Sequence, residues 1–261
     1  MPREIRLHKE DRYSRIRLVT GIDIRAIRKA RVCVVGAGAL GNEVIKNLAL
    51  YAPARLSVVD RDYVELSNLG RCFLFDYKDA EMRRSKAKAV SRNVGRINPD
   101  CRIEPIHEDA AALDSDFFSQ YDVVVGCVDN IKTRLHINSN CYFSEIPYID
   151  GGIDGMYGRV QVISPPDGAC YECTINSTHN ARIDLGYSCT GREANVPGRQ
   201  IASEPSVCGI VGSLQALEGL RLVSGTLNEG ILLFFNGNES SLTTFDLTID
   251  AKCTNHTGTA Q

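Results

Sequence analysis

The sequence predicts an α/β protein with a Rossmann-like, doubly wound and mostly parallel sheet, a C-terminal antiparallel extension and an irregular insert. Three observations support this prediction. Short β-branched runs alternate with stretches of helical periodicity, a glycine-rich turn follows the first run, and an acidic residue ends the second. The chain has 261 residues and 43% apolar content, which is enough to form one large core.

The first part of the chain reads as a strand, a glycine turn and a helix. Residues 31–35 form a β-branched run that stops at Gly36, and residues 39–50 carry apolar side chains at helical spacing. Residues 85–97 form a second helical stretch, with Lys86 at its start. Further strand-like runs lie at 56–59, 101–106, 121–125 and 148–149. This alternation is typical of parallel strands that helices connect.

The character of the chain changes after Gly158. The run GRVQVISPP predicts a strand, and residues 167–206 are rich in Gly, Asn, Ser and Cys with little periodicity, as in many functional inserts. A mostly buried helix is expected from Val207 onward, and the runs ILLFF and SLTTFDLTI predict two final strands.

Composition argues against several classes of partner. The net charge is -2 and the pI is near 6.2, so the chain lacks the concentrated excess of Lys and Arg that nucleic-acid binding requires. The N-terminal segment is charged, and the apolar run at 231–235 is too short to span a bilayer. We therefore expect a cytoplasmic protein with neither nucleic acid nor a membrane as partner.

The glycine turn predicts a phosphate site. The segment Gly36-Ala-Gly-Ala-Leu-Gly41 follows a strand and opens a helix, where exposed amide groups and the helix dipole favour phosphate. The next strand ends in Asp60. Taken alone, this pattern is the fingerprint of a nicotinamide dinucleotide fold in which Asp60 accepts a hydrogen bond from the ribose.

The following polar loop favours a different chemistry. It reads DRDYVELSNLGR and brings Asp62, Asn68 and Arg71 to the carboxyl edge of the sheet. Adenylation of a carboxylate needs cations on the triphosphate and a carboxylate that holds magnesium. Arg71, Lys86 and Asp129 are candidates for these roles. The alternatives are that Lys86 is a solvated helix lysine and that Asp129 only caps the next helix.

The order and spacing of several motifs resemble those of the ThiF/MoeB/ubiquitin-activating enzyme superfamily. They are RYSR, GAGALG, DRD, SNLGR, a following lysine, VDN and a late CxxC, within residues 11–256. The resemblance implies that the chain uses ATP and magnesium to adenylate the C-terminal glycine of a ubiquitin-like protein. The implied nucleotide-binding residues are Gly36, Gly38, Gly41, Asp60, Asp62, Asn68, Arg71, Lys86 and Asp129.

Two further features follow from this resemblance. In that family the second arginine of the RYxR motif, here Arg15, reaches across a dimer interface into the neighbouring ATP site, which implies a homodimer with Arg15 as a catalytic residue. The alternative is an ordinary surface arginine. Cys72 stands where the family usually has Gln, and this departure leaves a contact near the triphosphate open.

Two spaced pairs of potential ligands predict a structural zinc site. Cys170 and Cys173 have the CxxC spacing, and Cys253 and His256 supply a second pair as CxxH. Zinc is the natural occupant of such a set, which would pin the end of the chain to the insert. Family members commonly have a second CxxC instead. The alternative is a redox pair or free thiols, with His256 in a disordered tail.

Two cysteines are candidates for a thioester. Cys189 lies in the irregular segment, where the nearby Arg192 and Arg199 would favour its thiolate, so it is the candidate catalytic cysteine. Cys208 lies in the expected apolar helix, where burial raises a thiol pKa and favours a packing role.

The leading hypothesis is adenylation followed by thioester formation on Cys189 and transfer to a conjugating enzyme. The alternatives are a sulfur-carrier adenylyltransferase, as in the molybdopterin and thiamine pathways, a non-catalytic subunit of a heterodimeric activating complex, and a nicotinamide-dependent dehydrogenase. One domain, 1–261, is expected. Its parts are a helical arm (1–30), a nucleotide-binding part (31–165), a thiol-bearing crossover insert (166–206) and a C-terminal part that completes the zinc site (207–261).

Overall fold

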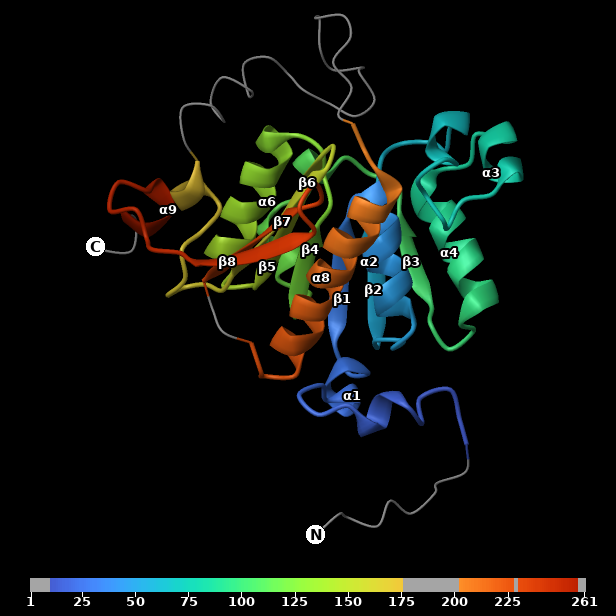
Figure 1. Ribbon diagram of the computed structural model, residues 1–261, viewed down its shortest axis with the longest axis horizontal. Coiled ribbons are helices and arrows are strands. Elements are labelled where there is room, and N and C mark those ends of the chain that lie inside the picture. Colours follow the sequence, from blue (N-terminus) through green and yellow to red (C-terminus); the bar gives the residue numbers. More distant parts are fainter. Residues whose placement is uncertain (1–9, 176–201, 228–229, 258–261) are drawn as a thin grey trace, which may run out of the picture.

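The computed structural model describes residues 10–175, 202–227 and 230–257. An eight-stranded sheet with the order β3-β2-β1-β4-β5-β6-β7-β8 forms its centre (Figure 1). The strands are β1 (Arg31–Val35), β2 (Arg55–Val59), β3 (Ile103–Ile106), β4 (Val123–Gly126), β5 (Tyr148–Asp154), β6 (Tyr157–Ile163), β7 (Ile231–Asn236) and β8 (Ser241–Asp246). Strands β1 to β5 pair in parallel, and β6, β7 and β8 continue the sheet in antiparallel fashion. The predicted parallel sheet with its antiparallel extension is confirmed.

Helices cover both faces of this sheet. One face carries α1, α2, α4 and α8, and the other carries α5 and α6, while the short helix α9 packs beside α6. The helices are α1 (Ile24–Ile27), α2 (Ala39–Ala49), α3 (Tyr77–Glu81), α4 (Lys86–Ile97), α5 (Ser115–Phe118), α6 (Ile131–Phe143), α8 (Pro205–Val223) and α9 (Thr254–Thr257). The described residues also form the 3-10 turns η1 (Ile16–Leu18), η2 (Leu66–Asn68), η3 (Ala110–Ala112) and η4 (Glu172–Thr174).

The alternation of side chains in the central strands builds two cores. Val32 and Val34 of β1 pack with α2 and α8, whereas Cys33 and Val35 pack on the opposite side. All four side chains are buried, as expected for a parallel strand covered on both faces. Each buried valine stabilises the fold by roughly 1.5–3 kcal/mol relative to an exposed one.

Some element boundaries differ from the sequence prediction. The strand expected from residue 101 begins at Ile103, because Cys101 belongs to a turn in which its amide donates to the Asn98 carbonyl. The strand expected from residue 121 begins at Val123. The strand expected at 148–149 extends to Asp154, because it pairs with β6 along its whole length.

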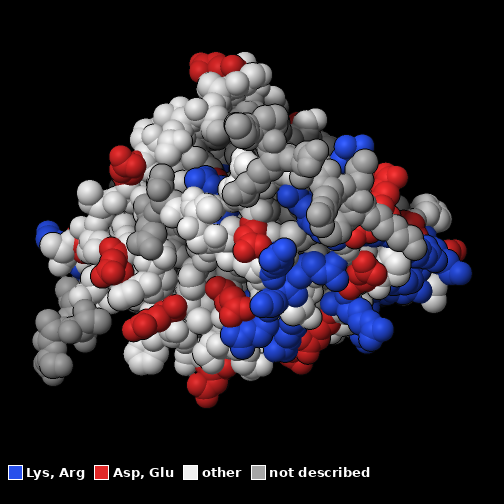
Figure 2. All heavy atoms as spheres, turned by 90° about the horizontal axis from the view of Figure 1, so that it is seen from below, with Lys and Arg blue, Asp and Glu red and all other residues white. Residues whose placement is uncertain are grey.

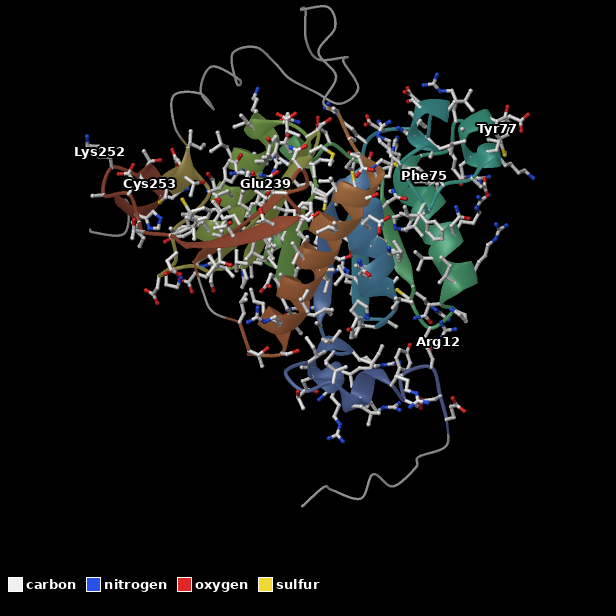
Figure 3. The ribbon with its side chains drawn as sticks, viewed as in Figure 1. Arg12, Phe75, Tyr77, Glu239, Lys252 and Cys253 are labelled. Atoms are coloured by element: carbon white, nitrogen blue, oxygen red, sulfur yellow. The ribbon has the colours of Figure 1, made fainter. Side chains whose placement is uncertain are left out.

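The N-terminal arm packs at the amino ends of the parallel strands. Arg12, labelled in Figure 3, donates to the Ile97 carbonyl at the end of α4 (3.0 Å), and the Tyr13 hydroxyl donates to Asp100 (2.9 Å). Within residues 10–30, only η1 and α1 are helical, so the described part of the arm has less helix than expected.

Charges of both signs mix on the lower face of the molecule. Figure 2 shows Lys and Arg side chains gathered there with Asp and Glu among them. Ion pairs such as Arg17–Asp11 (2.6 Å) and Arg31–Asp122 (2.7 Å) neutralise part of this basic charge. A surface of this kind does not provide the uniform basic field that favours a nucleic-acid backbone.

Helix α8 is long and apolar enough to cross a membrane by length and composition, which is weak evidence because core helices pass the same test. It packs against α2 and against β4, β5 and β6. Its buried residues, such as Val207 and Val211, belong to the larger core. This packing is that of a core helix.

Candidate active site

A pocket opens at the carboxyl ends of the parallel strands. The chain builds the sheet outward from β1 to β3 and then returns to place β4 on the other side of β1. The pocket lies at this reversal of strand order, where ligands bind in open α/β sheets. Of the residues that the sequence singled out, the pocket is lined by Gly36, Gly38, Asp60, Asp62, Asn68, Arg71, Lys86 and Asp129.

The glycine turn forms one wall of this pocket. Gly36 has a φ of +98°, and a Cβ there would lie 2.6 Å from the Cys127 carbonyl oxygen, so only glycine fits. Gly38 is the N-cap of α2, and the first turn of that helix presents amide groups to the pocket. Gly41 is not part of the lining. A Cβ on Gly41 would lie 2.0 Å from the Gly36 carbonyl oxygen, so Gly41 lets α2 pack on the turn.

Three charged residues beside the turn form one network. The Asp60 carboxylate accepts from the amides of Ala37 (2.7 Å) and Asp62 (2.8 Å), and Lys86 Nζ donates to the Asp62 carboxylate (2.8 Å). Burial raises the pKa of Asp60 despite the opposing effect of Lys86. Burial also lowers the pKa of Lys86, but Asp60 and Asp62 raise it by more, so the net pKa lies above its usual value. Lys86 is therefore a buried cation rather than the solvated lysine considered above.

The polar loop that carries Asn68 and Arg71 is locally ordered. The Asn68 side chain accepts from the Glu65 amide (2.9 Å), which closes a reciprocal cap around η2. Arg71 Nη1 donates to the Ser67 carbonyl (2.7 Å), and the guanidinium lines the pocket. These contacts bring the loop to the edge of the sheet, as the sequence predicts.

The interpretation of Asp129 as the cap of the next helix is wrong. The N-cap of α6 is Asn130, whose side chain accepts from the Thr133 amide (2.8 Å). Asp129 instead contributes to the pocket wall, beside the glycine turn.

Sequence reasoning missed Arg134, which supports the Asp129 loop. Its Nη2 donates to the Val128 carbonyl (2.5 Å), and its Nη1 donates to the carboxylate of Asp150 (2.6 Å). Burial lowers the pKa of Arg134, but Asp150 outweighs this effect and the net shift is upward. The only signal in the sequence is an arginine in the first turn of α6, which does not reveal its buried partner.

Arg15 lies far from the pocket of its own chain. The N-terminal arm lies at the amino ends of the parallel strands (Figure 1). Arg15 is exposed and precedes η1 on this arm, whereas the pocket lies at the carboxyl ends of the strands. Within one chain the structure therefore does not bring Arg15 together with the other predicted residues.

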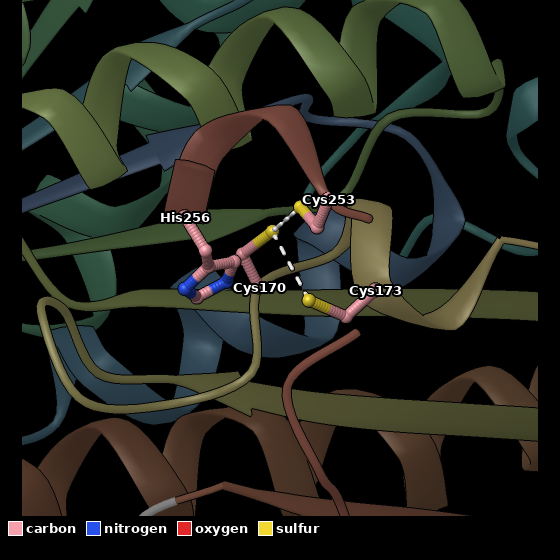
Figure 4. Close-up of side chains that lie close together, drawn as sticks. All are labelled: Cys170, Cys173, Cys253 and His256. Carbon is pink, nitrogen blue, oxygen red and sulfur yellow. Dashed lines mark hydrogen bonds between the residues drawn. The ribbon is translucent and has the colours of Figure 1, made fainter. Parts of the chain in front are cut away.

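The four predicted metal ligands converge at a second site (Figure 4). The ligand atoms of Cys170, Cys173, Cys253 and His256 all lie within 4.8 Å of one another. The Sγ atom of Cys170 lies 3.8 Å from that of Cys173 and 3.5 Å from that of Cys253. Zinc–sulfur bonds of about 2.3 Å in a tetrahedral site separate two sulfurs by about 3.8 Å. The donor set and its spacing fit zinc.

The surroundings of this cluster favour metal ligation. His256 lies in α9, so the interpretation that places it in a disordered tail is wrong. Its Nδ1 lies 2.9 Å from the Tyr142 hydroxyl, a contact of the kind that orients a ligating histidine. The side-chain Nδ2 of Asn255 donates to Cys170 Sγ (3.5 Å). All three cysteines are free thiols, which does not support a disulfide among them.

The remaining thiols differ in their surroundings. Cys189, with Arg192 and Arg199, lies outside the described residues. Cys208 on α8 is fully buried, and burial raises its pKa to about 11, which supports the packing role. Cys72 is also buried, with a pKa raised by burial to about 12, and does not line the pocket.

Comparisons with known proteins give a consistent result. The ThiF family model matches residues 11–255. The chain is 31% identical over 220 residues to a molybdopterin-synthase adenylyltransferase from Escherichia coli, covering 82% of each protein. It is 31% identical over 252 residues to the SAMP-activating enzyme E1 of Haloferax volcanii, covering 93% of this chain and 87% of that protein.

Other similarities are partial or structural. The chain is 36% identical over 166 residues to SUMO-activating enzyme subunit 2 from Dictyostelium discoideum, but the match covers only 25% of that protein. The crystal structure of Escherichia coli MccB with ATP has a TM-score of 0.78 and 19% identity, covering 96% of this chain and 75% of that one. This last similarity concerns the fold alone.

Proposed function

Because the chain belongs to the ThiF family, we propose that it uses ATP to adenylate the C-terminal carboxylate of a small carrier protein. The observation that carries this proposal is the convergence of the glycine turn, Lys86, Arg71 and Asp129 on one pocket. The similar Escherichia coli and Haloferax proteins, named as an adenylyltransferase and an activating enzyme, support the same reaction class.

In the proposed reaction, a carboxylate oxygen of the carrier attacks the α-phosphorus of ATP. The bond between the α-phosphorus and the bridging oxygen breaks, pyrophosphate leaves with the electron pair, and an acyl adenylate remains. The amides of the first turn of α2, Lys86 and Arg71 would neutralise the phosphates. Asp60 would hold the ribose, and Asp129 would place magnesium, which supplies charge neutralisation when bound.

Two competing functions account for less of the site. A nicotinamide-dependent dehydrogenase uses the glycine turn and Asp60, but leaves Arg71, Lys86 and Asp129 in the pocket without a role. A non-catalytic subunit has no need for these three side chains in one pocket. Lys86 is buried, and its ion pair with the half-buried Asp62 offsets the cost of desolvating the ammonium group. A buried cation held in the pocket in this way also favours a retained site.

The identity of the carrier and the fate of the adenylate form a finer part of the proposal. We infer a ubiquitin-like carrier that ends in glycine, capture of its acyl group on Cys189, and a conjugating enzyme as the next acceptor in the cytoplasm. Transfer to a sulfur donor is the alternative. The zinc site formed by Cys170, Cys173, Cys253 and His256 would anchor the start of the Cys189 segment.

ATP–pyrophosphate exchange tests the proposed reaction. The purified chain is mixed with ATP, magnesium and a diglycine-ended ubiquitin-like protein, and exchange of labelled pyrophosphate into ATP is measured. We expect Asp129→Ala to reduce exchange at least about a hundredfold, the usual effect of removing a group that stabilises developing charge. Asp116→Ala, an exposed change on α5, is the matched control. Near-normal exchange in Asp129→Ala would remove Asp129 from the mechanism.

Intact mass under non-reducing conditions distinguishes the two fates of the adenylate. An adduct that dithiothreitol removes, and that Cys189→Ser abolishes, supports the thioester route. Exchange without any adduct supports transfer to a sulfur donor instead.

A further inference from the structure

One buried side chain bonds both the glycine turn and the loop that follows Arg71. Asn42 lies on the first turn of α2 and is fully buried. Its Nδ2 donates to the carbonyls of Ala37 (2.8 Å) and Gly38 (3.1 Å), and its Oδ1 accepts from the Leu74 amide (2.7 Å). A single planar amide therefore fixes the distance between these two segments.

The loop is held from its other side as well. Asn93 of α4 donates to the Leu74 carbonyl (2.7 Å) and to the Asp79 carboxylate (3.0 Å). Phe75, which follows Leu74 and is labelled in Figure 3 on the α3 side of the molecule, donates its amide to the Cys72 carbonyl (3.3 Å). The backbone from Cys72 to Phe75 is thus clamped between α2 and α4, with Arg71 directly before it.

The clamped segments carry two parts of the candidate phosphate site. Gly38 lies at the N-terminus of α2, and Arg71 reaches the pocket from the loop. Consecutive phosphates of one nucleotide have a fixed spacing, so the backbone amides and the guanidinium must keep a matching distance. A displacement of about 1 Å at such a site can cost about a hundredfold in rate.

We propose that Asn42 is a positioning residue that sets the separation between the glycine turn and Arg71 for the phosphates of ATP. This inference rests on the proposed function. It assigns no contact with the nucleotide to Asn42, whose three hydrogen bonds all go to backbone groups. The same bonds satisfy buried carbonyl and amide groups, so a purely structural role must be separated by experiment.

Asn98 offers a matched control at the other end of α2. It is also fully buried, and its Nδ2 donates to the Ala49 carbonyl (2.7 Å). Asn42→Ala and Asn98→Ala each remove a buried amide that bonds a carbonyl at one end of this helix. Both changes should lower stability, but only the first lies beside the pocket.

Calorimetry with ATP and with adenosine, together with amide hydrogen exchange, tests the inference. We expect Asn42→Ala to weaken ATP binding about tenfold, or ~1.4 kcal/mol. The affinity of Asn42→Ala for adenosine should be nearly unchanged, and so should the affinity of Asn98→Ala for ATP. The Leu74 amide should exchange faster only in Asn42→Ala. The double variant with Arg71→Ala should bind ATP no more weakly than Arg71→Ala alone, because two coupled changes are not additive.

Three results would overturn the inference. They are equal ATP affinities for Asn42→Ala and Asn98→Ala, full additivity with Arg71→Ala, and equal weakening of ATP and adenosine. If Asn42→Ala does not fold, Asn93→Ala loosens the same loop from α4, and unchanged ATP affinity there counts against the proposal. If the unaltered chain neither binds ATP nor exchanges pyrophosphate, the proposed function fails and takes this inference with it.

Discussion

Burial separates the cysteines in the described part of the chain into groups with different chemistry. A thiol reacts as its thiolate, and an apolar environment disfavours that charged form. Cys33 and Cys127 lie inside strands or at their ends, with pKa values raised by burial. Cys170 and Cys253, although also buried, lie beside other thiols, which fits the proposed role as metal ligands. The position of a cysteine in the fold therefore decides its function.

Cys208 should resist alkylation in the folded protein. Its pKa of about 11 leaves about 0.1% thiolate at pH 8, compared with roughly a quarter for an ordinary exposed thiol. Because the thiolate fraction grows as the pH approaches the pKa, labelling by iodoacetamide should increase from pH 8 to pH 10. Peptide mapping by mass spectrometry measures this, and the chain in guanidinium is the control. Rapid labelling of Cys208 at pH 8 in the folded chain would reopen its candidacy as the thioester cysteine.

Single-residue roles could be predicted where the sequence shows the local geometry. The glycine turn and the loop from Asp60 follow strands, so their meeting at one edge of the sheet was predictable. The buried partners of Arg134 and Asn42 come from distant segments, Asp150 and Leu74, and no local pattern reveals them. Whether Asp129 or its neighbour Asn130 is the N-cap of α6 depends on backbone angles, which the residue types alone do not determine.

At the scale of secondary-structure elements, hydrophobic periodicity identified the parallel strands and helices but not all of their ends. Strand β5 continues beyond its apolar residues because β6 folds back on it from Asp154 to Tyr148. The short helix α9 has no periodic signal and is instead placed by the cluster that includes Cys253 and His256. Tertiary pairing, rather than propensity, decides both features.

The cysteine cluster should hold one zinc ion per chain and anchor α9. Cys173→Ser removes one of four ligands, so elemental analysis should show the loss of zinc. The melting temperature should fall by roughly 5 °C for a loss of about 1–2 kcal/mol. Cys101→Ser changes a buried thiol outside the cluster and is the matched control, which should keep its zinc. Unaltered protein without zinc, or equal melting temperatures for both variants, would contradict a structural metal.

At the scale of the whole molecule, the arm and the pocket lie at opposite ends of the parallel strands. Arg15 is exposed on the arm and cannot reach the pocket of its own chain. A symmetric dimer could solve this problem, because each arm could then reach the pocket of the partner. Such an arrangement would place a catalytic cation in each site only after assembly, which ties activity to the dimer.

Complementation between inactive chains tests this shared site. Arg15→Ala and Asp129→Ala should each exchange pyrophosphate poorly. In a dimer of one chain of each kind, the pocket with intact Asp129 receives intact Arg15 from its partner, while the other pocket lacks both groups. Random pairing makes half of all dimers mixed, so co-expression should restore about a quarter of the unaltered activity.

Co-expression of Arg15→Ala with a chain that carries both changes provides no intact arm and should restore none. Equal activity in the two mixtures would mean that Arg15 does not act across the interface, and the cation completing the site would then have to come from elsewhere.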